Sequence, residues 1–341
     1  MREGAGVSGV RRESEVAVQG SATSSDTVER SKLPARPDDS RHVSLWSRVW
    51  QERAMYLFIL PGFLFFVVFR YLPLAGNIVA FENYSPYQGI IQSEWVGLNN
   101  FVQLFQDPRV GQALVNTLVI NGLQLIFFFP APIALALLLN SILSPTVKRV
   151  IQTIVYLPYF IGWVVLVSVW QSVLGGDGLL NQALADHGFG AINLMSNPEL
   201  FKPMMVVQYM WKYVGWGTII FLAALTKIDP ALYESAVVDG ARPIRRMWHV
   251  TLPGIKGIAI LLLILNLGNI LTTGFEQILL QEPAVGEQAG QVLDTFVYLE
   301  GVVGGNWGLA TAVGLFKGVV GTILIVVANK VAHLLGEDGV F

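Results

Sequence analysis

One apolar stretch of the chain carries polar and aromatic side chains at intervals of three and four residues. Gln208, Tyr209, Lys212, Tyr213 and Trp216 would lie within about a third of the circumference of a helix built from this stretch. Amide and phenol groups hydrogen-bond to hydroxyls, and aromatic rings pack on apolar C–H surfaces. The combination favours the binding of a hydroxyl-rich ligand such as a sugar, and it needs no covalent chemistry.

A second apolar stretch repeats this arrangement with amides, a hydroxyl and a carboxylate. Its members are Asn266, Asn269, Thr273, Glu276 and Gln277, again at helical spacing. Such groups are costly in hydrocarbon unless they are hydrogen-bonded. We therefore expect both stretches to face the interior of a helix bundle, a cavity or a partner chain.

The charged members of these apolar stretches have more than one interpretation. Lys212 could attract a carboxylate of an acidic oligosaccharide, or it could form an ion pair or hydrogen bond that joins two helices. For Lys317 we favour a structural role, or a side chain that reaches the membrane interface. Glu276, near the outer end of its stretch, could equally lie at the interface.

Residues for bond-making or metal chemistry are missing or scattered. The chain has no cysteine, and its four histidines lie far apart in the sequence. No G-x-S-x-G or H-E-x-x-H motif and no close pair of acids within an apolar stretch is present. We expect neither a catalytic residue nor a metal site.

The composition is typical of an integral membrane protein. Of the 341 residues, 53% are hydrophobic and only 13% are charged, against about 25% charged in soluble domains. The net charge of −2 gives no reason to expect nucleic acid as a partner. Residues 1–48 are rich in Ser, Arg, Glu and Gly, and we predict a disordered cytoplasmic tail there. Residues 49–341 then form one all-α membrane domain.

Six segments have the ~20 mostly apolar residues that a membrane-spanning helix needs. They are 54–75, 113–140, 151–174, 203–225, 255–280 and 310–335. An even count puts both termini on the same side of the membrane. The basic residues gather on that side, before residue 56, at Lys148 and Arg149, within 227–256 and at Lys330. By the positive-inside rule that side, with both termini, is cytoplasmic.

Between the fourth and fifth predicted spans lies a charged segment, 229–254, that is interrupted by Gly and Pro. Asp229 followed by Pro230 predicts the start of a short helix, and Gly240 predicts its end. Pro243 can start a second helix that ends before Pro253. We therefore predict a cytoplasmic helix-turn-helix with an amphipathic surface that could insert into a groove on another protein.

The same segment resembles the EAA motif of ABC-importer permeases through Glu234-Ser235-Ala236, Asp239-Gly240-Ala241 and Leu252-Pro253. In that family the motif forms the coupling helix that an ATPase subunit holds. The resemblance implies this role for Glu234, Ala236, Asp239, Gly240, Ala241, Arg242, Leu252 and Pro253. Ser235 stands where the family usually has Ala, and Met247 where Phe is frequent.

The resemblance covers nearly everything after the tail and is closest to the LplB-type polysaccharide permeases. It includes Arg70-Tyr71-Leu72-Pro73, Tyr156-Leu157-Pro158-Tyr159-Phe160, Phe275-Glu276-Gln277-Ile278 and Gly314-Leu315-Phe316-Lys317. Tyr159 stands where many relatives have His, and Glu276 where Asp is common. These two departures leave the identity of the sugar open.

The resemblance implies a subunit of a bacterial cell-membrane importer for oligosaccharides or polysaccharide fragments, in which a partner ATPase drives alternating access. The implied partners are a second homologous permease, two copies of a cytoplasmic ATPase, and an extracytoplasmic solute-binding protein that reaches the outer loops near Asn83, Tyr84 and Trp307. ATP and Mg²⁺ would bind to the ATPase, because this chain lacks G-x-x-x-x-G-K-[ST]. The alternative is a self-contained, ion-coupled secondary transporter, for which paired carboxylates within spans and an inverted repeat are expected.

Overall fold

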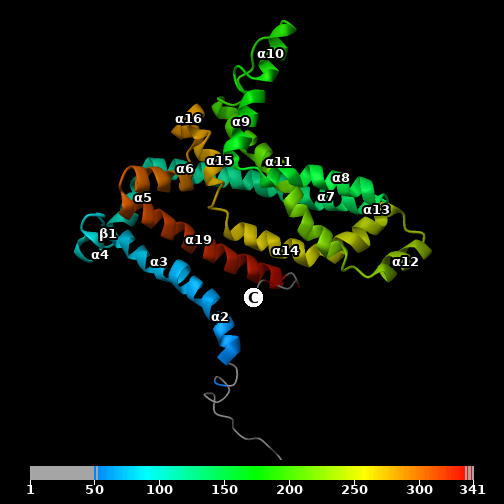
Figure 1. The fold of residues 1–341 in the computed structure, drawn as a ribbon, viewed down its shortest axis with the longest axis horizontal. Coiled ribbons are helices and arrows are strands. Elements are labelled where there is room, and N and C mark those ends of the chain that lie inside the picture. The colour runs from blue at the N-terminus through cyan, green and yellow to red at the C-terminus, as the bar shows by residue number, and fades with distance from the viewer. Residues whose placement is uncertain (1–49, 51–52, 335, 337–338, 340–341) are drawn as a thin grey trace, which may run out of the picture. The chain divides into compact units, whose positions relative to one another are not determined.

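The computed structural model describes residue 50, residues 53–334, and residues 336 and 339. The predicted tail, 1–48, lies outside the described residues. The chain consists of two units, Met1–Phe63 and Leu64–Phe341. Almost every described element is helical, as Figure 1 shows.

The first long helical segment begins at α2 (Arg53–Phe66). It continues through a π-helical turn (Val67–Tyr71), α3 (Leu72–Leu74) and a 3-10 helix (Ala75–Phe81). Four short elements follow, namely β1 (Glu82–Asn83), α4 (Gly89–Gln92), β2 (Glu94–Trp95) and α5 (Asn99–Gln106). The two strands are antiparallel, with Glu82 opposite Trp95.

The middle of the chain contains α11, which together with α19 is one of the two longest helices described. Its elements are α6 (Pro108–Leu123), a π-helical turn (Gln124–Phe128), α7 (Pro130–Ser141), α8 (Pro145–Tyr156), a 3-10 turn (Leu157–Phe160), α9 (Trp163–Leu174), α10 (Leu179–Asp186) and α11 (Pro198–Leu225). Helix α11 is the central element, because it packs against α6, α7, α8 and α14. Its 28 residues include buried polar side chains, Gln208, Lys212 and Thr218 among them.

The last third of the chain alternates short and long helices. Its elements are α12 (Pro230–Val238), α13 (Pro243–Arg246), a π-helical turn (Met247–Thr251), α14 (Leu252–Gly268), α15 (Phe275–Leu279), α16 (Glu282–Val285), α17 (Glu287–Gly290), α18 (Leu293–Val297), a π-helical turn (Tyr298–Val303) and α19 (Trp307–Leu334). Helices α14 and α19 cross closely where Gly268 meets Gly321, since a Cβ on Gly321 would lie 2.5 Å from the Gly268 carbonyl oxygen.

Three of the prolines inside long helical segments each follow a π-helical turn that ends two residues earlier. The turns Val67–Tyr71, Gln124–Phe128 and Met247–Thr251 precede Pro73, Pro130 and Pro253. A proline ring clashes with the carbonyl four residues earlier and cannot donate a hydrogen bond to it. The wider π turn accommodates that carbonyl, so the helix passes the proline without stopping.

Three predictions about the helices were wrong, two because a predicted span is interrupted and one because a helix continues. The predicted third span, 151–174, is not one helix, because α8 ends at Tyr156 and α9 begins at Trp163. The predicted fifth span, 255–280, is also interrupted, because α14 ends at Gly268 and α15 begins at Phe275. The second helix of the 229–254 segment does not end before Pro253, since the chain stays helical from Pro243 to Gly268.

Five helical segments of the described residues are long and apolar enough to cross a membrane. They are Arg53–Phe81, Pro108–Ser141, Trp163–Asp186, Pro243–Gly268 and Trp307–Leu334. Helix α11 is as long as α19, but its polar and charged side chains make it less apolar than these five. These findings establish a helical protein with several apolar spans, and the number of six stays a prediction.

Candidate functional site

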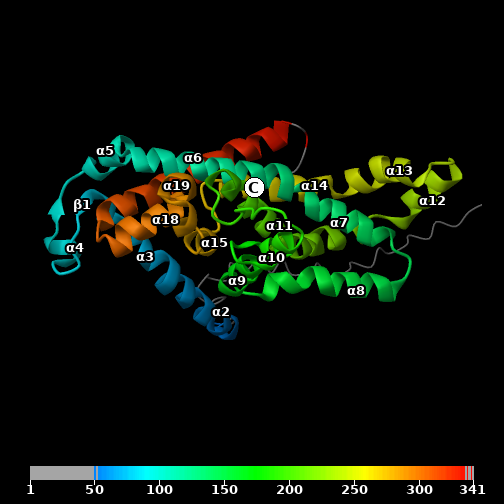
Figure 2. The same ribbon diagram turned by 90° about the horizontal axis from the view of Figure 1, so that it is seen from above.

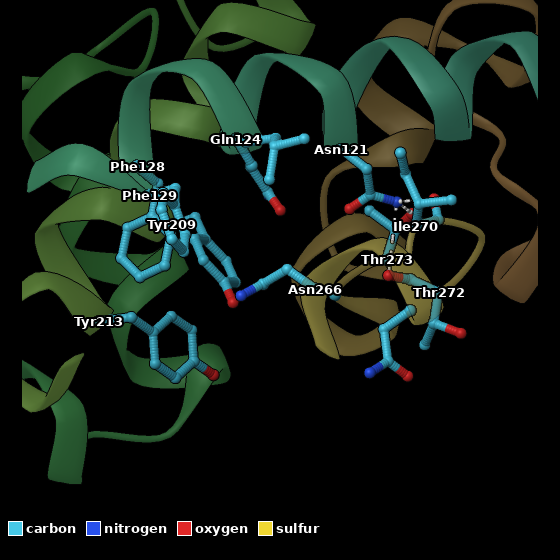
Figure 3. A pocket seen from close by; sticks show the side chains of 13 residues that line it. Asn121, Gln124, Phe128, Phe129, Tyr209, Tyr213, Asn266, Ile270, Thr272 and Thr273 are labelled. Carbon is cyan, nitrogen blue, oxygen red and sulfur yellow. Dashed lines mark hydrogen bonds between the residues drawn. The ribbon is translucent and has the colours of Figure 1, made fainter. Parts of the chain in front are cut away.

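A cavity of about 300 Å³ opens between the second span, α11 and the end of α14. Its lining consists of amides, hydroxyls and aromatic rings and contains no charged side chain. The lining residues are Asn121, Gln124, Leu125, Phe128, Phe129, Tyr209, Tyr213, Asn266, Asn269, Ile270, Thr272, Thr273 and Gly274. Figure 3 shows Asn266 and Tyr209 pointing toward each other across this cavity.

The asparagines of the cavity donate their N–H groups to backbone carbonyls and, in one case, to a threonine hydroxyl. Asn121 Nδ2 donates to the Ile270 carbonyl oxygen at 2.8 Å and to Thr273 Oγ1 at 2.9 Å. Asn266 and Asn269 donate to carbonyls one turn earlier in α14, at 2.8 and 2.9 Å. Each carboxamide oxygen is thereby left as an acceptor for a ligand hydroxyl.

Gln124 supplies the opposite kind of group. Its side chain is only 9% exposed, and Nε2 is buried without a hydrogen-bond partner among the described residues. Figure 3 shows the side chain reaching into the cavity from the helix above it. A buried donor without a partner is unfavourable until an acceptor reaches it, so a ligand oxygen would satisfy this group.

An aromatic series continues from the cavity along α11. The ring centroids of Phe128 and Tyr209 are 4.9 Å apart, and those of Tyr209 and Tyr213 are 4.5 Å apart. Tyr159 lies 5.8 Å from Tyr213 and stacks on Trp216 at 4.1 Å with an interplanar angle of 2°. These rings present the flat apolar surfaces on which the C–H faces of sugar rings pack.

The structure brings half of the sequence-predicted pathway residues to the cavity. Tyr209, Tyr213, Asn266, Asn269 and Thr273 line it. The interruption after Gly268 means that the predicted polar stripe from Asn266 to Gln277 does not lie along one helix. The other five predicted residues lie elsewhere.

Gln208 and Gln277 belong to a buried amide network instead. The Gln208 and Gln281 side chains pair with each other through two hydrogen bonds of 3.0 and 2.9 Å. Gln277 Nε2 donates to Gln208 Oε1 at 3.1 Å and to the Met205 carbonyl oxygen at 3.0 Å. The network joins α11 to α15 in the interior of the second unit.

Lys212 and Trp216 flank the interruption of the third span, whereas Glu276 lies on the surface. Lys212 is 5% exposed, and its ammonium donates to backbone carbonyls of that interruption. These are contacts of the helix-joining kind that one interpretation of the sequence expected. Trp216 is 43% exposed and carries the Tyr159 stack. Glu276 is exposed in the first turn of α15.

Lys317 forms an ion pair rather than lining the cavity. Its ammonium contacts Asp294 Oδ1, and Asp294 Oδ2 accepts a hydrogen bond of 2.8 Å from the backbone N–H of Thr273. Asp294 therefore links α19 to the non-helical segment that forms one wall of the cavity. This is the structural role that the sequence favoured for Lys317.

Sequence reasoning did not include Asn121 and Gln124 among the pathway residues. A signal was present, because these two amides lie three residues apart in an otherwise apolar run. The same criterion that selected the fourth and fifth spans would have selected this part of the second span.

The 229–254 segment forms the short helix that its sequence predicts. The Asp229 side chain caps α12 by accepting from the Ala231 N–H at 2.9 Å, and Gly240 ends it with φ of +72°. The Tyr233 hydroxyl donates to Thr251 Oγ1 at 3.1 Å, which ties α12 to the helix that follows. Glu234, Asp239 and Arg242 are exposed, as is much of the apolar surface of this segment, with Val238 at 88%.

At the other end of the second unit a polar hollow of about 430 Å³ lies beside β1. Asn83, Tyr84 and Trp307 all line it, although Trp307 is more than 200 residues away in sequence. The hollow also contains Asn99, Asn100 and Asn306. The structure thus brings together the two outer segments that the sequence named separately.

Proteins of similar sequence align with most of the chain. Residues 129–336 match the family described as binding-protein-dependent transport system inner membrane component. The polygalacturonan/rhamnogalacturonan transport system permease protein YteP of Bacillus subtilis (strain 168) is 44% identical over 292 residues, 85% of this chain and 91% of YteP. Protein LplB of the same organism is 43% identical over 300 residues, 88% of this chain and 94% of LplB.

A solved structure is similar over the same extent. It is the crystal structure of a bacterial alginate ABC transporter in complex with an alginate pentasaccharide-bound periplasmic protein. The match has a TM-score of 0.79 at 36% identity and covers 87% of this chain and 99% of the other. The sequence match over 129–336 and the identity to both relatives agree with this similarity of fold. The chain belongs to the family of binding-protein-dependent transport system inner membrane components.

Proposed function

We propose that the chain is the transmembrane permease subunit of an ATP-driven ABC importer for oligosaccharides or polysaccharide fragments. The observation that carries the proposal is an uncharged cavity, lined by amides and tyrosines, in a chain of this transport family. YteP is a transport permease for polygalacturonan and rhamnogalacturonan, and the similar solved structure is an alginate transporter. We propose for the present chain the same general class of substrate, namely oligosaccharides or fragments of polysaccharides.

The cavity and its aromatic extension form this subunit's share of the substrate path. Carboxamide oxygens of Asn121, Asn266 and Asn269 accept from sugar hydroxyls, and Gln124 Nε2 donates to a sugar oxygen. The rings of Tyr209 and Tyr213 support the C–H faces of the sugar. The second wall of the path comes from a homologous permease, which makes the functional unit a pair.

The α12 segment is the proposed contact with the ATPase. Helix α12 is short, capped at both ends and tied to the long helix Pro243–Gly268 by the Tyr233–Thr251 hydrogen bond. A movement of α12 is therefore transmitted to the helix that carries Asn266. The exposed apolar side chains Leu232, Val237 and Val238 supply a surface for a groove on the partner. ATP and Mg²⁺ bind to the two ATPase subunits and not to this chain.

The positions of the two ends support the proposed orientation. Figures 1 and 2 both place the turn between α7 and α8 beside α12 and α13 at one end of the second unit, with α4, β1 and α5 at the other. The basic residues Lys148, Arg149, Arg245 and Arg246 belong to the first end, which we assign to the cytoplasm. The hollow beside β1 then faces outward, where a solute-binding protein delivers the sugar. Six spans with both termini in the cytoplasm of a bacterial cell remain our proposal for the whole chain.

The proposal is tested by mutation of α12 in the assembled transporter. Glu234→Ala is expected to reduce sugar uptake into vesicles by at least about tenfold, as for loss of an interface hot spot, and to weaken retention of the ATPase on affinity-purified permease. Ser235→Ala on the same helix is the control and should leave both unchanged, because it introduces the residue that the family usually has.

An ion-coupled carrier would behave differently. Its uptake would persist in vesicles that lack the ATPase and would respond to an imposed ion gradient instead of ATP. Undiminished uptake without the ATPase would contradict the proposal, whatever the effect of the α12 variant.

A further inference from the structure

The predicted third span, 151–174, is interrupted, so its backbone carbonyls there lack the N–H groups of a continuing helix, although the Pro158 carbonyl oxygen still accepts from the Ile161 N–H at 3.2 Å. Helix α8 ends at Tyr156, a single 3-10 turn covers Leu157–Phe160, and α9 starts only at Trp163. Pro158 contributes no N–H to this turn. Unpaired carbonyls in the interior of a membrane protein cost several kcal/mol each, so the interruption requires another donor.

Lys212 of α11 supplies that donor. Its ammonium donates to the carbonyl oxygens of Pro158 at 3.4 Å and Tyr159 at 3.2 Å, and to that of Ile161. An ammonium group has three N–H bonds, and here each has a backbone acceptor within the interruption. The ammonium also lies 5.3 Å from the ring centroid of Trp163 and 5.5 Å from that of Tyr213.

The same contacts leave no N–H of Lys212 for a substrate. The side chain is 5% exposed, and it is absent from the lining of the cavity next to it. The helices are also tightly packed here, because a Cβ on Gly215 would lie 2.3 Å from the Val155 carbonyl oxygen. The Lys212 side chain is thus enclosed between α11 and the interruption that follows α8.

The position of Lys212 on α11 determines which aromatic rings it holds in place. Trp216 lies one turn further along the same face, and its ring stacks on that of Tyr159, whose carbonyl Lys212 binds. Tyr213, between them in sequence, contacts Tyr159 and lines the cavity. The lysine therefore fixes the backbone on which the outer part of the aromatic series depends.

We propose that Lys212 is a positioning residue that closes the interrupted third span and holds Tyr159 against Trp216 and Tyr213. It acts through these rings and does not bind a substrate carboxylate. This chain's wall of the path then recognises hydroxyls and the C–H faces of sugar rings, and any carboxylate of an acidic glycan is bound outside this wall. The second part of the proposal rests on the transport function proposed above.

The first test measures position and does not depend on transport. The chain has no cysteine, so a spin label can be attached at Phe160→Cys, a side chain that is 73% exposed within the interruption, in the assembled transporter in lipid nanodiscs. Lys212→Met is expected to sharpen the spectrum of this label through increased mobility. Lys212→Gln, which is uncharged but still donates, is expected to restore part of the immobile spectrum. Lys202→Met on the same helix is the control.

An unchanged spectrum in folded Lys212→Met would overturn the positioning role. If that variant does not fold, Lys212→Gln decides alone. Its label should be more mobile than in the wild type, because two amide N–H bonds replace three ammonium ones. Equal mobility would again overturn the proposal.

The second test measures selectivity in vesicles with galactotriose and trigalacturonate as the neutral and acidic substrates. Lys212→Gln is expected to lower the uptake of both by the same factor, so that their ratio stays constant. A loss of about tenfold or more for trigalacturonate alone, the effect of removing a charge-assisted hydrogen bond, would overturn the proposal. If the wild type carries neither sugar, the proposed substrate class fails, while the spin-label result still decides the role of Lys212.

Discussion

Amide side chains have two different structural roles in this chain. Gln208, Gln277 and Gln281 are buried and satisfy one another, so they join helices. Asn121, Asn266 and Asn269 satisfy only their N–H groups and leave their oxygens at the cavity. Residue type and spacing indicated that these amides avoid lipid. The choice between structural and ligand-binding roles depends on neighbours that lie far away in sequence.

Glu282 gives a prediction about pH. Glu282 is 4% exposed, and its buried Oε2 has no hydrogen-bond partner among the described residues. Burial raises the pKa of Glu282, although hydrogen bonds with Thr295 and Gln291 act in the opposite direction. The folded protein therefore holds this proton more tightly than the unfolded chain does. Its stabilising effect is present below pH 4.5, the ordinary pKa, and is lost as the pH rises through the folded-state pKa.

We expect the thermal midpoint of the wild type to fall, relative to Glu282→Gln, as the pH rises from about 5 to about 8. Each unit of pKa difference corresponds to about 1.4 kcal/mol. Asp186→Asn, at an exposed position of α10, is the control and should follow the wild type. A constant difference between the wild type and Glu282→Gln over this range would show that Glu282 keeps its ordinary pKa.

Gly215 gives a prediction about packing. A Cβ at this position would lie 2.3 Å from the Val155 carbonyl oxygen and 2.9 Å from the Tyr156 ring. Gly215→Ala is expected to destabilise the folded protein by about 1 to 3 kcal/mol through overpacking, measured by thermal unfolding in detergent. Gly111→Ala in α6, where nothing lies within 4 Å, should be neutral or stabilising. Equal midpoints for the two variants would mean that α8 and α11 can separate at no cost.

At the scale of elements, the positions of the long helices were predictable, whereas their interruptions and the short helices between them were not. Apolar runs located the long helices, and the Asp229 cap and the terminal Gly240 located α12. The interruptions at 157–162 and 269–274 lie inside two of the predicted spans. They exist because distant side chains satisfy the freed backbone, Lys212 in one case and Asn121 with Asp294 in the other. These partners belong to other helices, so the sequence of a single span does not reveal them.

Pro253 gives a prediction about an element. The π turn Met247–Thr251 lets the helix pass this proline. Pro253→Ala removes the steric reason for the wide turn, and Ala is favoured over Pro in a helix interior by about 3 kcal/mol. We expect the turn to relax to an α-helix, which rotates Thr251 away from Tyr233 and breaks their hydrogen bond.

The expected result is impaired coupling in a protein that is at least as stable as the wild type. ATP-dependent uptake should fall while the thermal midpoint is unchanged or higher. Pro198→Ala at the first position of α11, where a missing N–H is harmless, should preserve uptake. Normal uptake in Pro253→Ala would show that the π turn has no part in coupling.

At the scale of the whole molecule, the sequence established membrane class and family but not the exact spans. Composition excluded a soluble protein, and the EAA resemblance identified the transport family that the comparisons show. Helix α11 explains why counting spans was less secure. It is long enough to cross a membrane, but its central position lets it carry buried polar groups that lower its hydropathy. Hydropathy therefore underestimates the ability of a helix to span the membrane when other helices surround it.

The absence of cysteine permits a direct test of orientation. Tyr87 and Leu143 are 100% and 98% exposed in two different loops, and Val238, the last residue of α12, is 88% exposed. In intact cells a membrane-impermeant maleimide should label Tyr87→Cys, and it should label Leu143→Cys and Val238→Cys only after permeabilisation. Labelling of Val238→Cys in intact cells would place α12 outside and exclude its contact with an ATPase.

The ion pair between Lys317 and Asp294 has a mechanical consequence. Because Asp294 also accepts from the Thr273 N–H, it links α19 to the segment 269–274, and Asn121 joins the second span to the same segment. The asparagine side of the cavity is therefore held together by side-chain hydrogen bonds from three parts of the chain. The tyrosine side, on α11, is connected to it differently, through the ring contact of Tyr209 with Phe128 and through the buried hydrogen bond between Gln208 and Gln277.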